Sequence, residues 1–242
     1  MPSVHLVASG RLGFSLTDAY DCHAYLVDAG DVAVLVDAGA GRAPELVLDR
    51  IAATGVDPGR IACILLTHGH ADHAGGAGAL AHELDAEVWA PAGWADALEH
   101  GDEEAVGLVG ARASGIYPPD YRLPPCPIDR RLDAGRIEVG SLRVQAVATP
   151  GHCRDHLSFV AELDGRRVAF GGDLVFSGGR VVLLPPPAGD AVALGRSLDA
   201  LAELAPDVLL AGHGEMVLEN AVADLTSARD ALAAGAPRSL AL

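Results

Sequence analysis

Short apolar runs alternate along this chain with stretches whose apolar positions recur at helical spacing. The apolar runs are rich in Val, Ile and Leu, which is typical of buried strands. They predict strands at residues 4–7, 24–27, 32–37, 61–66, 87–90, 137–139, 142–148, 157–163, 168–171 and 208–211. Helical spacing predicts helices at residues 44–54, 77–84, 191–204 and 221–234, with a further one from about Trp94. Strands in clusters with helices between them favour an α/β protein with layered sheets.

One core can organise a chain of 242 residues, so a single domain over residues 1–242 is the simplest prediction. The segment from Gly115 to Pro127 departs from the pattern, because its proline density excludes a regular helix or a central strand. Long irregular loops in compact domains are often lids. We therefore predict that Tyr117 and Tyr121 in this segment contact a substrate.

A polar run stands directly after one of the predicted strands. Thr67-His68-Gly69-His70-Ala71-Asp72-His73 follows the apolar residues Ile64-Leu65-Leu66. A neutral imidazole offers one nitrogen lone pair, and carboxylate oxygens suit the same borderline cations. The run therefore predicts half of a transition-metal site, with zinc as the first choice of ion.

Three later polar residues also follow strand-like runs and have glycine beside them. They are His152 in Thr149-Pro150-Gly151-His152, Asp173 in Gly171-Gly172-Asp173 and His213 in Ala211-Gly212-His213-Gly214. Ligands collect at the carboxyl ends of strands in layered α/β proteins, and glycine lets the backbone come close to an ion. These residues are thus candidates for the remaining ligands. A structural zinc site would usually be closed by thiolates, and the sequence has no CxxC pair.

In this order, the motifs HxHxDH, TPGH, GD and GH resemble the metallo-β-lactamase superfamily. The resemblance runs from the strand end at residues 34–39 to His213, and it implies that superfamily's αββα four-layer sandwich. The chain is most similar to the glyoxalase II-like branch, where Asp173 matches a bridging carboxylate and Phe176 completes a GDxxF motif. The most familiar secreted β-lactamases have Cys at the position of Asp173, so the chain does not resemble them.

The resemblance implies a site for two divalent metal ions, with zinc as the first choice and iron or manganese as alternatives. His68, His70 and His152 would hold the first ion, Asp72, His73 and His213 would hold the second, and Asp173 would bridge both. Asp72 would also orient the attacking hydroxide. His156 and Phe176 join the two tyrosines as predicted substrate contacts, with a supporting role behind the ligands as the alternative for His156.

The predicted activity is hydrolysis of an activated acyl compound by a metal-bound hydroxide. Two cations lower the pKa of a bridging water from about 15.7 toward about 7. A thioester is favoured as the substrate, because a thiolate leaving group needs little protonation. Two alternatives stay open: a lactone hydrolase with the same metals, and a persulfide dioxygenase with one iron.

Composition narrows the choice of partners. Asp and Glu number 33 and the 17 basic residues are all arginine, which gives a net charge of -16 and argues against nucleic acid. No run of about 18 apolar residues predicts a membrane span, and no signal peptide is recognisable at the N-terminus. We therefore expect a cytoplasmic protein with free thiols and a small-molecule acyl substrate, and a homodimer is left open.

Overall fold

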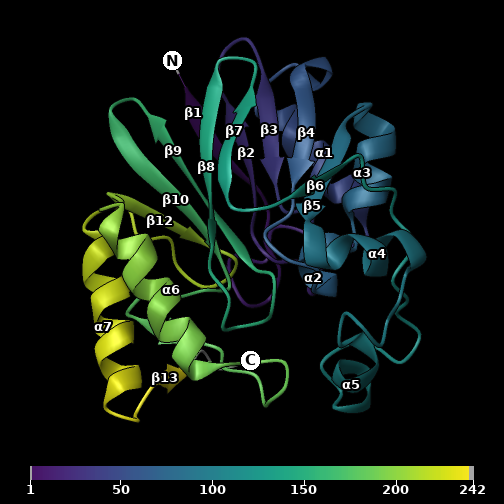
Figure 1. Cartoon of the computed structure of the whole chain (residues 1–242). Coiled ribbons are helices and arrows are strands. Elements are labelled where there is room, and N and C mark those ends of the chain that lie inside the picture. Colours follow the sequence, from purple (N-terminus) through teal and green to yellow (C-terminus); the bar gives the residue numbers. More distant parts are fainter. Residues whose placement is uncertain (1, 240–242) are drawn as a thin grey trace. The chain divides into compact units, whose positions relative to one another are not determined.

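The computed structural model describes residues 2–239, which form two compact units (Figure 1). The first unit ends at Leu132 and the second begins at Asp133. Each unit has a sheet and helices of its own, which confirms the predicted α/β class. That both units make up one hydrolase domain stays a prediction.

A six-stranded mixed sheet forms the centre of the first unit, and its strands follow one another in chain order. The strands are β1 (Ser3–Ala8), β2 (Ala24–Asp28), β3 (Ala33–Val36), β4 (Ile61–Leu65), β5 (Glu87–Pro91) and β6 (Arg130–Leu132). β1, β2 and β3 pair antiparallel, and β3 to β6 pair parallel. β3 and the end of β4 are buried throughout, as expected of parallel strands covered on both faces.

The helices of the first unit occupy the connections between the parallel strands. They are α1 (Pro44–Ala53), α2 (Ala71–Ala74), α3 (Ala77–Leu84), α4 (Ala92–His100) and α5 (Leu108–Ala113), with a 3-10 turn at Pro58–Arg60. Pro44 stands in the first turn of α1, as predicted, and α1 buries Val47 and Ile51. Figure 1 shows α2, α4 and α5 at the same end of this unit.

The register of β3 and β4 sets the position of the polar run that follows β4. Leu35 pairs with Ile64 and Val36 with Leu65, so the two strands end side by side. The N–H of Asp37 continues the ladder by donating to the carbonyl of Leu65 over 2.9 Å. Asp37 and the run that begins at Thr67 therefore leave the sheet next to each other.

The second unit has a five-stranded sheet with the order β12-β10-β9-β8-β7. Its strands are β7 (Gly135–Val139), β8 (Leu142–Ala148), β9 (Leu157–Leu163), β10 (Arg166–Gly172) and β12 (Val208–Ala211). A small sheet pairs β11 (Arg180–Val181) with β13 (Arg238–Ser239). β10 and β12 pair parallel with Gly172 opposite Ala211, so the segments that follow them emerge at the same edge.

Two helices pack together in the second unit, α6 (Ala191–Glu203) and α7 (Ala221–Ala233). Asp190 caps α6, because its carboxylate accepts hydrogen bonds from the N–H groups of Val192 and Ala193. Leu194, Leu198 and Leu201 of α6 share a buried core with Leu225 of α7.

The predicted strands and long helices are present with small shifts of their ends, and the predicted irregular segment from Gly115 to Pro127 contains neither helix nor strand. α2, α5, β6, β11 and β13 were not among the predicted elements. None of the helices within residues 2–239 is long and apolar enough to cross a membrane.

Candidate functional site

The first unit gathers the predicted ligands of the HxHxDH run where β4 passes into α2. Nε2 of His68 lies 3.0 Å from Nδ1 of His70, and Nε2 of His73 lies 3.7 Å from Oδ2 of Asp72. His68 and His73 are fully buried, whereas His70 and Asp72 are partly exposed. α2 brings Asp72 and His73 to this place, because a short helix directly after His70 turns the chain back at the strand end.

Asp37 holds this cluster from the neighbouring strand end. Its Oδ1 accepts a hydrogen bond from the N–H of Thr67 at 2.8 Å, and its Oδ2 accepts one from Nδ1 of His73 at 2.8 Å. The Thr67 hydroxyl lies 2.9 Å from Oδ2 of Asp37 and 3.0 Å from Nδ1 of His68. This pattern assigns the proton of both rings to Nδ1, so Nε2 carries the lone pair that a metal would need.

The second unit brings His152, Asp173 and His213 together. Oδ2 of Asp173 lies 3.6 Å from Nε2 of His152 and 3.6 Å from Nε2 of His213. Nδ1 of His152 donates to the carbonyl of Val182 at 2.9 Å, which again leaves the lone pair on Nε2. One carboxylate oxygen equally close to two imidazoles is an arrangement suited to a bridging ligand.

His156 supports this cluster through hydrogen bonds. Its Nε2 accepts a hydrogen bond from the N–H of Asp173 at 3.2 Å, and its Nδ1 lies 2.8 Å from the hydroxyl of Thr149. That hydroxyl in turn lies 2.9 Å from the hydroxyl of Ser158. These contacts fix the main chain that carries Asp173, and they fit the supporting role that the sequence left open for His156.

Glycine is required at two places where another element approaches the ligand segments. A Cβ at Gly69 would lie 2.4 Å from the ring of Trp94 in α4, so this ring packs against the backbone between His68 and His70. Gly151 has φ of +140°, and a Cβ there would lie 2.4 Å from the Cα of Leu194 in α6.

The donors fit a borderline divalent metal. Histidine and aspartate side chains in both units could hold metal ions, and imidazole nitrogen with carboxylate oxygen is a donor set that zinc accepts. Cys22 lies close by, with its sulfur within 4.8 Å of ligand atoms of Asp37 and His73. Burial raises the pKa of this thiol to about 12.

Of the predicted substrate contacts, Tyr121 and Phe176 are buried and Tyr117 is partly exposed. The hydroxyl of Tyr121 donates to the carbonyl of Ala40 at 2.6 Å and approaches that of Ala71 at 3.2 Å. The Phe176 ring packs beside the His213 ring, with centroids 6.0 Å apart. Both residues thus support segments that carry candidate ligands, and their contact with a substrate stays a prediction.

Sequence reasoning missed the segment that precedes β2. Oδ1 of Asp21 accepts a hydrogen bond from the N–H of Ala40 at 2.7 Å, and burial raises the pKa of this carboxyl. The N–H of Cys22 donates to the carbonyl of Asp72 at 3.2 Å. No sequence motif predicts these contacts, because they join segments that are distant in the sequence.

Residues 17–213 match the family described as the metallo-beta-lactamase superfamily, and the chain belongs to this superfamily. It is 37% identical over 161 residues to a hydroxyacylglutathione hydrolase of Anaeromyxobacter dehalogenans (strain 2CP-C), a match that covers 66% of this chain and 48% of that relative. It is 32% identical over 220 residues to a hydroxyacylglutathione hydrolase of Acidiphilium cryptum (strain JF-5), covering 89% of this chain and 74% of the relative. The chain therefore spans about half of the first relative and three quarters of the second.

Solved structures agree on the fold. The MIM-2 metallo-beta-lactamase matches with a TM-score of 0.69 and 23% identity over 91% of this chain and 85% of its own. BJP-1, a subclass B3 metallo-beta-lactamase of Bradyrhizobium japonicum, matches with a TM-score of 0.68 and 24% identity over 88% of this chain and 85% of its own. The predicted metallo-β-lactamase fold is confirmed, and so is the predicted resemblance to the glyoxalase II-like branch, whose curated relatives bear the name hydroxyacylglutathione hydrolase.

Proposed function

We propose that this chain is a dinuclear metal-dependent hydrolase of acyl thioesters. The observation that carries the proposal is the placement of Asp173, whose Oδ2 is 3.6 Å from Nε2 of both His152 and His213. In the proposed arrangement His152 and His213 belong to different ions, so a carboxylate oxygen equally close to both imidazoles could bind both ions. The name hydroxyacylglutathione hydrolase, shared by the curated relatives, supports a thioester as the bond that is cleaved.

The proposed ligands are the seven residues of the four motifs. His68, His70 and His152 would hold one ion, Asp72, His73 and His213 would hold the other, and Asp173 would be shared by both. Zinc is the proposed ion, because imidazole and carboxylate donors suit it. When bound, two such ions supply a nucleophile at neutral pH and polarise the acyl carbonyl.

The chain's own residues hold the reacting groups in place. Asp37 and Thr67 fix the rings of His73 and His68 through Nδ1, and the carbonyl of Val182 does the same for His152. His156 holds the main chain of Asp173. Asp72, which is partly exposed, would accept a hydrogen bond from the attacking water and orient it toward the carbonyl carbon. The thiolate then leaves without a separate general acid.

The substrate is proposed to be a small-molecule acyl compound handled in the cytoplasm. The test is a panel of thioesters and lactones that share one acyl chain, offered to protein of measured metal content. Thioesters should be hydrolysed fastest. Preference for lactones would replace the proposal with a lactonase, and one iron per chain with oxygen consumption on persulfides would replace it with a dioxygenase.

Asp173→Asn tests the bridging role. The amide keeps the shape of the side chain but loses the charge shared by the two imidazoles, so both metal content and turnover should fall. Asp207→Asn is a matched control in the same unit, since Asp207 is only partly buried and accepts a hydrogen bond from the N–H of Arg167. Two full equivalents of metal in Asp173→Asn would contradict the assignment.

A further inference from the structure

The first unit contains a cluster of arginine and tyrosine side chains that the metal chemistry does not use. We call it the arginine–tyrosine cluster, and it consists of Arg11, Arg42, Tyr20, Tyr117 and Tyr121. The guanidinium carbon of Arg11 lies 4.8 Å from the centroid of the Tyr20 ring, and that of Arg42 lies 5.3 Å from the same centroid. Two positive charges are thus held against one ring.

The cluster is continuous with the segment that carries the metal ligands. The Tyr20 and Tyr117 ring centroids are 5.7 Å apart, and those of Tyr117 and Tyr121 are 5.3 Å apart. The hydroxyl of Tyr121 then approaches the carbonyl of Ala71, the residue before Asp72, at 3.2 Å. A row of three rings therefore leads from the ligand helix α2 to the two arginines.

The charges of the cluster are only partly balanced within the described residues. Nε of Arg42 faces Oδ2 of Asp18 at 3.5 Å. Arg11 is exposed and donates to the carbonyl of Ile116 at 3.3 Å, but no carboxylate within residues 2–239 forms an ion pair with it. A chain with 33 acidic residues and 17 arginines offers many carboxylates, so an arginine placed on an aromatic ring instead is available to an external anion.

The chemistry of arginine defines the ligand. A guanidinium stacked on a ring keeps its N–H edge directed outward, and that edge binds carboxylate or phosphate through two parallel hydrogen bonds. A ring next to the guanidinium also covers the apolar part of a bound molecule. Two such groups on one tyrosine suit an anionic organic molecule better than a small inorganic ion.

We propose that the arginine–tyrosine cluster binds an anionic group, a carboxylate or a phosphate, on the thiol carrier of the substrate. This inference rests on the proposed thioesterase function. The cluster would set which thiol carrier is accepted, while the motif residues act on the acyl bond. Arg11 makes the main contact, and Arg42, which also faces Asp18, makes the weaker one.

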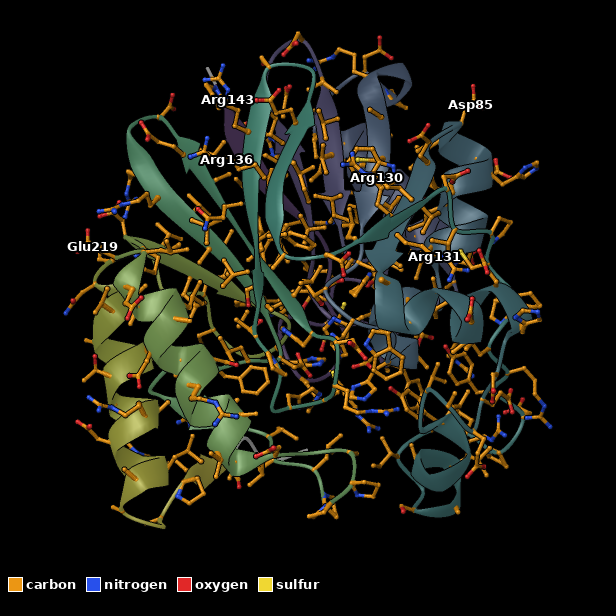
Figure 2. All side chains as sticks on the ribbon, in the orientation of Figure 1. Asp85, Arg130, Arg131, Arg136, Arg143 and Glu219 are labelled. Carbon is orange, nitrogen blue, oxygen red and sulfur yellow. The ribbon has the colours of Figure 1, made fainter. Side chains whose placement is uncertain are left out.

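The kinetic test compares three thioesters of one acyl group: a neutral carrier (N-acetylcysteamine), a dicarboxylate (mercaptosuccinate) and a phosphate (phosphopantetheine). Arg11→Gln should lower kcat/KM about tenfold on the preferred anionic carrier, through KM, and less than about twofold on the neutral one. The anionic carrier that the wild type prefers identifies the bound group as a carboxylate or a phosphate. Arg130→Gln is the matched control, because Arg130 on β6 (labelled in Figure 2) also stacks on a ring, with its guanidinium carbon 4.5 Å from the Trp89 centroid.

A binding measurement separates this inference from the proposed function. Calorimetry with S-methylmercaptosuccinate and with S-methylphosphopantetheine, neither of which can be hydrolysed, should give binding that Arg11→Gln weakens about tenfold and Arg130→Gln leaves unchanged. If no thioester is cleaved but this binding pattern holds, the thioesterase proposal fails and the anion site stands. If neither ligand binds, or both variants bind as the wild type does, the anion site is refuted whatever the activity.

Discussion

Replacing Asp37 with asparagine changes one acceptor in the network that orients the proposed metal ligands of the first unit. Asp37 is buried, and its carboxylate accepts from the N–H of Thr67 and from Nδ1 of His73, each at 2.8 Å. Its φ of +60° is left-handed, a conformation that Asn tolerates better than other residues. Asn can keep the bond from Thr67, but its amide N–H₂ then faces the Nδ1 proton of His73.

The expected loss of metal affinity follows from the placement of these two donors against each other. A hydrogen bond to a charged group contributes about 1.5–3 kcal/mol, and its removal lets the His73 ring turn or change tautomer. Changes in groups that orient metal-binding histidines usually weaken metal affinity by about 10–100-fold, which corresponds to about 1.4–2.8 kcal/mol. Asp37→Ala leaves three donors unpaired, the N–H and hydroxyl of Thr67 and Nδ1 of His73, at about 1–3 kcal/mol each, a large part of a total stability of about 5–15 kcal/mol. Asn is therefore the informative variant.

The assay is a zinc competition titration with a chromophoric chelator, with circular dichroism to establish that Asp37→Asn is folded. We expect one weakened site, a lower kcat at limiting zinc and partial recovery at excess zinc. Asp28→Asn is a suitable control, since Asp28 in β2 pairs with Arg60 away from the motif residues. Wild-type zinc affinity in folded Asp37→Asn would refute the role assigned to Asp37.

Three further predictions concern stability and reactivity. Tyr121→Phe removes the hydroxyl that donates to the Ala40 carbonyl, so thermal unfolding should show a loss of about 1–2 kcal/mol with unchanged metal content, and an unchanged melting temperature would contradict this. Burial raises the pKa of the Cys22, Cys63 and Cys126 thiols to about 12, so in the native protein these three should resist iodoacetamide at pH 8 and react only after unfolding in urea. Rapid labelling of these thiols in the native protein would contradict the prediction. The hydrogen bond from Arg112 lowers the pKa of Glu103 below its ordinary value of 4.5, so this pair stabilises the fold fully above pH 4.5 and the contribution is lost as the pH falls through the lowered pKa. The difference in unfolding free energy between wild type and Glu103→Gln should therefore shrink on acidification. A difference that stays constant would exclude the ion pair as its source.

The candidate ligands could be found from sequence because each follows an apolar run that is unambiguous as a strand. Glycine beside His152, Asp173 and His213 marked the turns, and the structure gives Gly151 both a positive φ and a close neighbour in α6. The register of β10 with β12 then accounts for the proximity of Asp173 and His213, which no local pattern could give.

The supporting contacts could not be predicted, since they depend on which segments the fold brings together. α2 has only four residues, too few for helical periodicity, and β6 is a three-residue edge strand whose Arg130 and Arg131 are polar. Tyr121 belongs to a proline-rich segment that reads as a surface loop, yet its ring is buried because its hydroxyl reaches main-chain carbonyls far away in the sequence. The roles of Asp21 and Cys22 arise in the same way.

The central claim is that seven residues on four strand ends hold two metal ions that act on a thioester. The most direct measurement is to strip the protein of metal and titrate zinc back while the initial rate of thioester hydrolysis is recorded. We predict no activity without metal and a rate that rises until about two equivalents of zinc are bound per chain. A full rate at one equivalent, or hydrolysis by the metal-free protein, would contradict the claim.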